Sequence, residues 1–329
     1  MSNAVKVEKL AKVFEFNKGR GFSKTRVETT AVDRISFEVP EGQSLAFIGP
    51  NGAGKSTTIK MLTGILRPTS GEAEVLSLVP WRQRNKLSRL IGAVFGQRSQ
   101  LWYHLPPRDT FELLSRIYEL DRSQYLRRSD MLIERFALAS FLDTPVRKLS
   151  LGQRMRAEVA ASLLHQPRIV FLDEPTIGLD VVARQELRDV IREWNREEGV
   201  TIFLTSHDAG DIESVSRRVI VINHGRIVLD DKISNMRRRY LSSKVLNIKF
   251  HDEHSEVAVN GVTVLKSTGY ALKLEVDCQV VGMEEVLHHV VNAGSVADIT
   301  IEDPPLEEVI AHIYGQAGSS EAAENVEVS

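Results

Sequence analysis

The sequence predicts an α/β fold with a mostly parallel central sheet, followed by a small α+β domain. The first observation is three apolar runs, at residues 45–48, 169–172 and 201–205, that are continuous instead of alternating. Such runs are typical of strands that are covered on both faces in a parallel sheet. The second observation is helical spacing of apolar residues at 106–164 and 182–197, between those strands. Strands that alternate with helices in this way favour a sheet with helices packed on its faces.

Before the first of these strands, the chain predicts an antiparallel N-terminal β subdomain. Residues 5–16 carry alternating apolar residues, as a half-buried strand does, and residues 35–39 form a second strand that ends at Pro40. Residues 17–30 carry basic and polar side chains among glycines. We interpret this segment as a long exposed hairpin or loop.

A glycine-rich loop joins the strand at 45–48 to a helix predicted at 55–66. It reads Gly49-Pro-Asn-Gly-Ala-Gly-Lys-Ser56 and fits the phosphate-binding motif G-x-x-x-x-G-K-[ST]. Its glycines let the backbone amides approach phosphate oxygens, toward which the new helix also points its positive end. Lys55 can reach the β- and γ-phosphates, and the Ser56 hydroxyl can ligate Mg²⁺. This places the core among the P-loop NTPases, with expected nucleotide contacts at Gly49, Pro50, Asn51, Gly52, Ala53, Gly54, Lys55, Ser56 and Thr57.

Two carboxylates follow the strand at 169–172. Asp173 and Glu174 come directly after four apolar residues. Open α/β sheets collect their ligands at the carboxyl ends of the strands. We therefore expect Asp173 to hold Mg²⁺, directly or through water, and Glu174 to polarise the water that attacks the γ-phosphate. The alternative, a solvated acidic turn, is disfavoured by the phosphate-binding loop upstream.

The segment 106–164 predicts a helical insertion, with a subdomain at about residues 100–165. The apolar faces of its first two helices are Phe111, Leu114, Ile117 and Tyr118, then Leu126, Leu132 and Phe136. A short strand at 90–95 precedes the insertion. Strands at 219–222 and 226–229 flank a hairpin signal at 223–225.

Near residue 240 the α/β pattern gives way to a series of short strands, which indicates a domain boundary. The predicted domains are a nucleotide-binding domain at 1–242 and a small α+β domain at 243–315. The expected strands and helices of that second domain are 245–250, 262–265, 271–276, the helix 283–291, 296–301 and the helix 306–314. Residues 316–329 are rich in Glu, Ala and Ser, a composition typical of a disordered tail.

Composition excludes several classes of protein. The chain has 329 residues, enough for two domains, and 42 Lys+Arg against 44 Asp+Glu leave a net charge of −2. That balance gives no argument for binding nucleic acid. Cys278 is the only cysteine, so an intrachain disulfide is impossible and a reducing compartment is expected. We expect a soluble chain without a signal peptide or a spanning helix, since no apolar stretch approaches about 18 residues.

A further motif, Leu149-Ser-Leu-Gly-Gln153, precedes a helical run. The order of this motif, the phosphate-binding loop and the two carboxylates, within residues 5–235, resembles the nucleotide-binding subunits of the ATP-binding-cassette (ABC) superfamily. The segment is similar to the family's signature, Leu-Ser-Gly-Gly-Gln. The resemblance implies that Ser150, Gly152 and Gln153 contact nucleotide.

The same resemblance implies four more site residues. Gln97 matches the Q-loop glutamine, Asp180 matches the D-loop aspartate, and His207 matches the switch histidine that contacts the γ-phosphate. Phe14 occupies the place of the aromatic residue that stacks on adenine, with Phe16 or no stacking as alternatives. The implied catalytic set is Lys55, Gln97, Glu174 and His207, and the implied Mg²⁺ ligands are Ser56, Gln97 and Asp173.

Two residues depart from the family pattern. Leu151 replaces a signature glycine, which reduces backbone freedom but leaves the Ser150 hydroxyl and the Gly152 N–H in place. Gly96 stands immediately before Gln97, where the family often has proline or an aromatic residue. Neither change removes a catalytic group.

The resemblance implies an ATPase that binds ATP and Mg²⁺ and works as a dimer, either a homodimer or a pair of related subunits. Ser150 of one subunit would close the ATP held by the loop of the other. The dimer would drive separate integral-membrane permease subunits at the cytoplasmic face of the inner membrane, through a groove near residues 97–105. Residues 95–102 and 305–310 resemble the ATPases of ABC-2-type exporters, including drug- and viologen-export systems.

Other activities remain open. ABC-type ATPases that act on ribosomes usually carry two cassettes, and this chain has one phosphate-binding loop. Chromosome and repair ATPases insert long coiled coils before the carboxylate strand, and no sustained heptads occur here. A regulatory module without hydrolysis is disfavoured because Glu174 and His207 are both present.

Overall fold

The computed structural model describes residues 2–18, 25–96, 99–240, 243–255, 257–302, 309–310 and 313. The chain divides into two compact units, Met1–Asp231 and Lys232–Ser329. The second unit thus begins at Lys232, whereas the sequence suggested residue 243. The difference is the helix α8 (Ile233–Tyr240), which belongs to the C-terminal unit.

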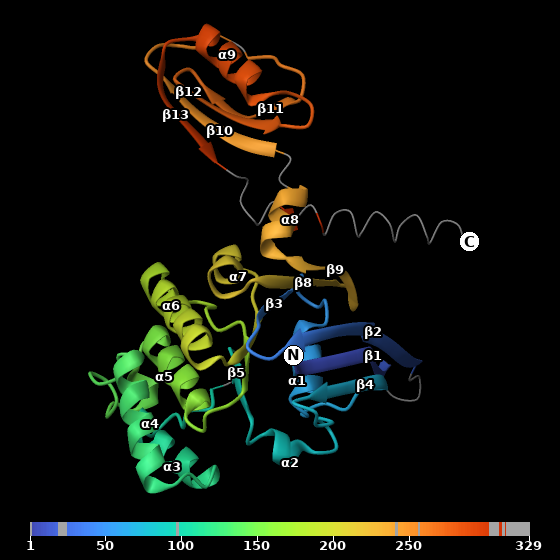
Figure 1. The fold of residues 1–329 in the computed structure, drawn as a ribbon, viewed down its shortest axis with the longest axis vertical. Helices are drawn as coiled ribbons and strands as arrows, with labels where there is room; N and C mark the ends of the chain where they lie inside the picture. Colours follow the sequence, from blue (N-terminus) through green and yellow to red (C-terminus); the bar gives the residue numbers. More distant parts are fainter. Residues whose placement is uncertain are drawn as a thin grey trace. The chain divides into compact units, whose positions relative to one another are not determined.

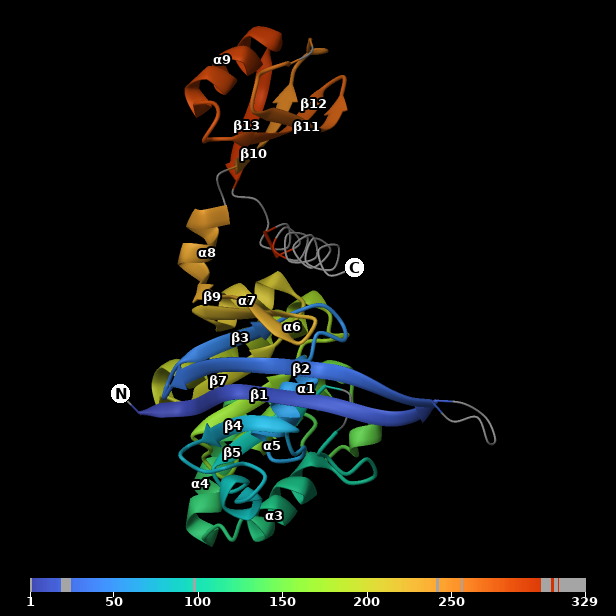
Figure 2. The ribbon, with the colours of Figure 1, turned by 90° about the vertical axis from the view of Figure 1, so that its right-hand side faces the viewer.

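The first unit opens with a three-stranded antiparallel sheet in the order β2-β1-β4 (Figures 1 and 2). Its strands are β1 (Asn3–Lys18), β2 (Thr25–Pro40) and β4 (Ser70–Val75). The pairing of β1 with β2 extends from Asn3 opposite Pro40 to Lys18 opposite Thr25. The segment predicted as a long exposed hairpin or loop is strand at residues 17–18 and 25–30, where the two strands pair as a hairpin does. Residues 19–24 lie outside the described part.

The central sheet has six strands in the order β5-β6-β7-β3-β8-β9. They are β5 (Ile91–Phe95), β6 (Ile169–Asp173), β7 (Thr201–Thr205), β3 (Ser44–Ile48), β8 (Arg218–Asn223) and β9 (Arg226–Lys232). The first five run parallel, as predicted.

Burial on both faces explains the continuous apolar runs. In β6, Val170 and Leu172 pack into a core shared with the helical region. Ile169 and Phe171 point the other way, into a core shared with the antiparallel sheet. All four apolar residues of β6 are therefore buried, so the sequence does not alternate.

Helices cover the sheet, and α3, α4 and α5 gather at one end of the unit (Figure 1). The helices of this unit are α1 (Lys55–Leu62), α2 (Arg84–Leu87), α3 (Pro107–Ile117), α4 (Arg122–Arg135), the 3₁₀ turn η1 (Val146–Lys148), α5 (Leu151–Leu163), α6 (Val181–Glu198) and α7 (Ala209–Val215). Helix α1 ends four residues earlier than predicted, because Gly64 adopts a left-handed conformation at φ 72°. Two residues assigned to buried faces are exposed: Ile117 at 55%, on the last turn of α3, and Leu126 at 44%.

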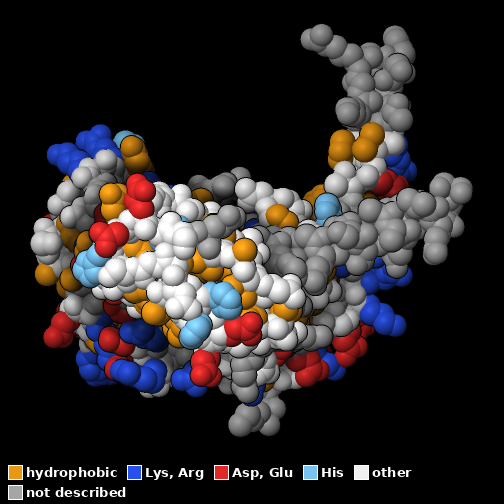
Figure 3. Space-filling model, turned by 90° about the horizontal axis from the view of Figure 1, so that it is seen from above, with side chains coloured by type: hydrophobic (Ala, Val, Ile, Leu, Met, Phe, Trp, Pro, Cys, Tyr) orange, Lys and Arg blue, Asp and Glu red, His pale blue; other side chains and the backbone are white. Residues whose placement is uncertain are grey.

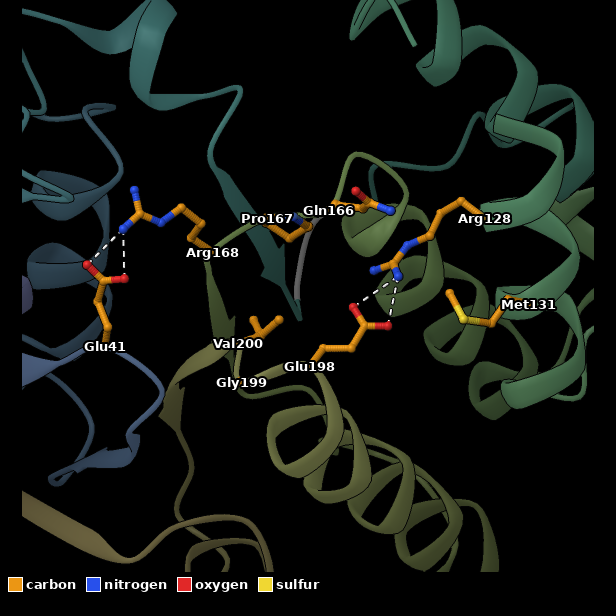
Figure 4. Close-up of a pocket in the computed structure, with 9 residues that line it drawn as sticks. All are labelled: Glu41, Arg128, Met131, Gln166, Pro167, Arg168, Glu198, Gly199 and Val200. Atoms are coloured by element: carbon orange, nitrogen blue, oxygen red, sulfur yellow. Dashed lines mark hydrogen bonds and ion pairs between the residues drawn. The ribbon is translucent and has the colours of Figure 1, made fainter. Parts of the chain in front are cut away.

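A cavity of about 680 Å³ lies at the amino ends of β6 and β7, beside Arg168 and Val200 (Figure 4). Its four charged side chains are paired. The Arg128 guanidinium donates to both carboxylate oxygens of Glu198, at 2.8 and 2.9 Å, and Arg168 pairs with Glu41 at 2.7 Å. The cavity is therefore at the opposite edge of the sheet from the glycine-rich loop. Its charged side chains bind one another and connect segments of the fold.

The His165 ring is buried next to the end of α5. It stacks on Tyr118 with the ring centroids 3.9 Å apart, and its Nε2–H donates to the Ile91 carbonyl at 2.9 Å. Burial lowers the pKa of His165 from 6.5 to about 4. The imidazole is therefore neutral in the folded protein at pH 7, and protonating it would leave a buried charge.

We expect the stability of the protein to depend on pH through His165. Between pH 4 and 6.5 the unfolded chain binds a proton that the folded chain does not, so stability falls as the pH is lowered through this window. The pKa difference corresponds to about 3 kcal/mol when the window is crossed completely. Urea unfolding at several pH values measures the free energy of unfolding, which should depend less on pH for His165→Gln than for the natural chain. His104→Gln, at an exposed histidine, is the control and should keep the pH dependence of the natural chain. If the free energy of unfolding of His165→Gln varied with pH as that of the control does, His165 would not be the source of the pH dependence.

The C-terminal unit contains a four-stranded antiparallel sheet and, in its described part, the helices α8 and α9, which matches the predicted α+β composition. Its elements after α8 are β10 (Ser243–Phe250), β11 (Val262–Thr268), β12 (Ala271–Asp277), α9 (Met283–Ala293) and β13 (Val296–Glu302), with strand order β11-β12-β10-β13. Val286 and Val290 of α9 pack on Leu246 and Leu274 of the sheet. Of the predicted helix 306–314 only residues 309, 310 and 313 are described, and they are helical. The tail 316–329 lies outside the described part.

The surface of this unit near α9 is mixed in character. In Figure 3, charged and histidine side chains alternate with scattered hydrophobic ones. The exposed apolar residues here include Val280 and Val291. Single apolar residues on a surface are ordinary and do not indicate a partner. Within the described ranges, no helix of either unit is long and apolar enough to cross a bilayer.

Candidate nucleotide-binding site

The glycine-rich loop lies at the carboxyl end of β3 and leads into α1. Gly52 and Gly54 have φ values of 84° and 108°, which strain any residue with a Cβ. A Cβ at Gly54 would lie 2.4 Å from the Ala31 carbonyl oxygen, and one at Gly49 would lie 2.2 Å from that of Ile222. The backbones of β2 and β8 therefore require glycine at positions 54 and 49, whether or not a ligand is bound.

Lys55 is the first residue of α1, and its side chain turns back over the loop. Its Nζ donates to the Gly49 carbonyl at 2.6 Å and to the Pro50 carbonyl at 3.2 Å. Burial lowers the pKa of Lys55, and the charges of Glu174 and Asp173 oppose this effect. The ammonium group is thus held at the loop, near two carboxylates, where the motif places the phosphates.

Ser56 and Asp173, predicted as metal ligands, lie together. The Ser56 hydroxyl donates to Asp173 Oδ1 at 3.2 Å. The Thr205 hydroxyl donates to the same oxygen at 2.6 Å and fixes the carboxylate from β7. These hydroxyl and carboxylate oxygens are the hard ligands that Mg²⁺ prefers, so the residues present fit that ion. The sequence reasoning missed Thr205; its place at the end of the strand next to β6 was the available signal.

Glu174 and His207, predicted to face the γ-phosphate, are in contact. The His207 Nδ1–H donates to Glu174 Oε2 at 2.5 Å. Glu174 adopts a left-handed conformation at φ 57°, which is unusual for a residue other than glycine and is found preferentially at functional sites. The His207 side chain is 62% exposed, so its other ring nitrogen is open to a ligand.

Gly96, one of the two departures from the family pattern, is explained by its close approach to the backbone of Asp173 and Glu174. Its N–H donates to the Asp173 carbonyl at 2.8 Å. A Cβ at Gly96 would lie 2.6 Å from the Glu174 carbonyl oxygen. Glycine therefore lets the end of β5 lie directly against the two carboxylate residues. Gln97 itself lies outside the described residues.

An ion-pair network behind His207 was not predicted. Asp208 accepts from Arg184 at 2.5 Å and from Arg188 at 2.6 Å. Asp211 accepts from Arg188 and from the Ser206 hydroxyl, both at 2.6 Å, and from Thr176. This network joins α6 to α7 and fixes the residues on both sides of His207. The spacing of Arg184 and Arg188 on one helix face was a signal, but their partners are about 20 residues away in the sequence.

The signature segment forms the start of α5. Ser150 is the N-cap: its Oγ accepts from the Gln153 N–H at 3.2 Å, and the Gln153 side chain accepts from the Ser150 N–H at 2.9 Å. Ser150 is exposed. Among the described residues, no hydrogen bond or ion pair connects Ser150, Gly152 or Gln153 with the loop at 49–57. Within the described part of the single chain, these two groups of predicted residues therefore make no direct polar contact.

The D-loop lies against this helix start. A Cβ at Gly178 would meet Leu151 Cδ2 at 2.9 Å, and one at Gly152 would meet the Cβ of Ala183 at the same distance. Asp180 is the exposed N-cap of α6 and accepts from the Ala183 N–H at 2.9 Å. Leu151, the other departure from the family pattern, packs over Gly178.

Phe14 lies on β1 with 38% of its surface exposed, and Phe16 is 49% exposed. The Lys12 ammonium lies 5.2 Å from the centre of the Phe14 ring. Part of each ring is thus accessible to a planar ligand, while the Lys12 ammonium lies over one face of the Phe14 ring.

The fold and this site together define a P-loop ATPase of the ATP-binding-cassette class. Residues 32–177 match the family model described as ABC transporter. The chain is 30% identical to the daunorubicin/doxorubicin resistance ATP-binding protein DrrA of Streptomyces peucetius, over 94% of this chain and 96% of that protein. It is 29% identical to the bacitracin transport ATP-binding protein BcrA of Bacillus licheniformis, over 79% of each.

A solved structure, cbiO1 from Clostridium perfringens, part of the ABC transporter complex cbiONQ, matches with a TM-score of 0.60 at 27% identity, over 73% of this chain and 94% of that chain. The chain belongs to the ABC transporter family. It is an ATP-binding subunit with ATPase activity, and the predicted relation to ABC-2-type exporter ATPases is confirmed.

Proposed function

We propose that this subunit works as a dimer in which each phosphate-binding loop faces the Ser150 of the other subunit. The observation that carries this proposal is that, among the described residues of one chain, no hydrogen bond or ion pair joins the exposed Ser150 to the phosphate-binding loop. Ser150 is exposed at the N-terminus of α5, where the helix dipole favours an anion. The surrounding surface is unusually apolar for exposed positions: Leu151 is 38% exposed, Ile177 40%, Val181 80% and Val182 67%. A second copy, or a related subunit, would cover this surface.

The residues of the loop and strand ends divide the catalytic roles in this proposal. Lys55 and the amides of residues 49–57 bind the phosphates, Glu174 orients the attacking water, and His207 contacts the γ-phosphate. Ser56 and Asp173 would hold Mg²⁺, with Gln97, and this ion would neutralise charge on the phosphates. Asp180 lies beside the signature segment and contributes to the dimer contact. Phe14 stacks on the adenine, since part of its ring is exposed on β1.

Membrane coupling is the second half of the proposal. The subunit binds integral-membrane permease subunits at the cytoplasmic face of the inner membrane. The docking surface is residues 102–105, where Trp102 is 40%, Tyr103 57% and Leu105 38% exposed. Exposed aromatic residues that lie together favour contact with an apolar partner. The names of the relatives, which refer to daunorubicin/doxorubicin resistance and bacitracin transport, favour export of an antibiotic.

Two Ser150 variants test the dimer. Ser150→Asp keeps a good N-cap for α5 but puts a negative charge opposite the phosphates, whereas Ser150→Ala loses a cap worth about 1 kcal/mol. In a Glu174→Gln background, we expect Ser150→Asp to abolish the dimer that forms on addition of ATP, as measured by size-exclusion chromatography with light scattering. Ser123→Ala, an exposed serine in the first turn of α4, is the control. An ATP-dependent dimer that survives Ser150→Asp would refute the proposed arrangement.

Purification from detergent-solubilised membranes tests the coupling. We expect a polytopic membrane protein to be recovered with the tagged chain, and Trp102→Ala with Tyr103→Ala to release it. Recovery of ribosomes or nucleic acid in its place would support the alternative of a non-transport ABC ATPase.

A further inference from the structure

Glu158 is a buried carboxylate in the middle of α5 that the catalytic site does not use. It is 3% exposed. It accepts a hydrogen bond from the Gln100 N–H at 2.9 Å and another from the Ser99 hydroxyl. Burial raises the pKa of this carboxyl group, and the hydrogen bonds from Ser99 and Gln100 and the charge of Arg154 oppose this effect.

The segment that Glu158 holds is also fixed to the central sheet. The Gln100 side-chain amide donates to the Ala93 carbonyl of β5 at 2.5 Å, and the Ser99 hydroxyl accepts from the Leu101 N–H at 3.1 Å. Residues 99–101 are thus attached to α5 on one side and to β5 on the other. Leu101 is buried, whereas Trp102 and Tyr103 directly after it are exposed.

A packing role alone does not account for this carboxylate. The neighbouring positions on α5, Ala157 and Val159, are buried and apolar. An apolar side chain at 158 would avoid the cost of removing a carboxyl group from water. Glu158 is the residue of α5 that accepts hydrogen bonds from the segment 99–100, and an apolar residue could not do so.

We propose that Glu158 is a positioning residue that links the segment 99–103 to the signature end of α5. This inference rests on the proposed function. Glu158 lies eight residues after Ser150 on the same helix, about 12 Å along its axis. A displacement of the exposed residues 102–103 by a permease moves residues 99–101, and the hydrogen bonds to Glu158 transmit this displacement to α5 and therefore to Ser150.

The test compares Glu158→Leu with Glu158→Gln. Leucine fills the space but accepts no hydrogen bond, while glutamine keeps one acceptor oxygen. For Glu158→Leu we expect ATP affinity of the separated subunit to stay within about twofold, because the phosphate-binding loop is intact. In the Glu174→Gln background, the ATP concentration needed for half-maximal dimerisation should rise by about tenfold, and glutamine should restore most of the loss. A fluorescent ATP analogue gives the affinity, and light scattering gives the dimer.

Ser162→Ala is the matched control, since Ser162 is also buried on α5 but donates within its own helix, to the Val159 carbonyl. It should leave dimerisation unchanged. Ser99→Ala removes one donor to Glu158 and should raise the ATP requirement by about threefold; it keeps the test valid if Glu158→Leu does not fold. Unchanged dimerisation in both Ser99→Ala and Glu158→Leu, or in Ser99→Ala alone where the leucine variant is unfolded, would overturn the inference. If the Glu174→Gln parent itself forms no dimer with ATP, the proposed function fails instead.

Discussion

Glu174→Gln should reduce ATP turnover by about 10²- to 10⁴-fold while leaving ATP binding intact, because the amide cannot accept the proton of the attacking water. In the structure the carboxylate accepts from His207, and the neutral amide would keep the shape of this contact. Phosphate release measures turnover, and equilibrium binding of a nucleotide analogue measures affinity. Because hydrolysis is blocked, the variant should accumulate as an ATP-bound dimer.

The exposed Glu193 on α6 provides the control. Glu193→Gln carries the same chemical change at a distance from the site and should turn over ATP at the natural rate. If Glu174→Gln retained near-natural turnover, Glu174 would have to be removed from its catalytic role. A loss of ATP binding would also contradict the assignment.

Lys55→Ala should weaken ATP binding by about 10- to 100-fold, since a charge-assisted hydrogen bond contributes about 1.5–3 kcal/mol. The variant also removes the donors to the Gly49 and Pro50 carbonyls, so the free loop loses two internal contacts. Isothermal titration with ATP and Mg²⁺ measures the affinity, and thermal unfolding reports the effect on the loop.

The control for this change is Lys60→Ala, because Lys60 is exposed on the same helix. It should bind ATP as the natural chain does. Equal affinities in the two variants would show that the Lys55 ammonium does not contact the phosphates.

The central sheet was predictable because its strands are buried on both faces and carry a strong local signal. Strand β4 was not predicted, since only Ala73 and Val75 of its six residues are buried and the rest are polar or glycine. Ile117 and Leu126 fit the helical period but lie at exposed positions. Periodicity locates the apolar face of a helix, but it does not show how many residues of that face are buried. The end of α1 depends on the left-handed Gly64, which the apolar spacing of residues 59–66 conceals.

The candidate site was predictable where a motif fixes residues that are adjacent in sequence. The loop at 49–57 is such a case, and so is the pair Asp173 and Glu174. The contact of Ser56 with Asp173 follows from the parallel sheet, which places the ends of β3 and β6 at one edge. Thr205 and the network around Asp208 were not predicted. The strand-end place of Thr205 and the spacing of Arg184 and Arg188 were signals, but their partners depend on which strands and helices become neighbours across long sequence separations.

The tight fit of the loop between β2 and β8 has a thermodynamic consequence. Its conformation is held by Ala31 and Ile222, and the Gly225 N–H donates to the Ala53 carbonyl at 3.1 Å. The phosphate-binding loop, here called the cradle, is therefore already ordered before a nucleotide binds, so its binding costs little conformational entropy. Variation in β2 or in the turn after β8, at residues that never meet a phosphate, should thus alter affinity by loosening the cradle.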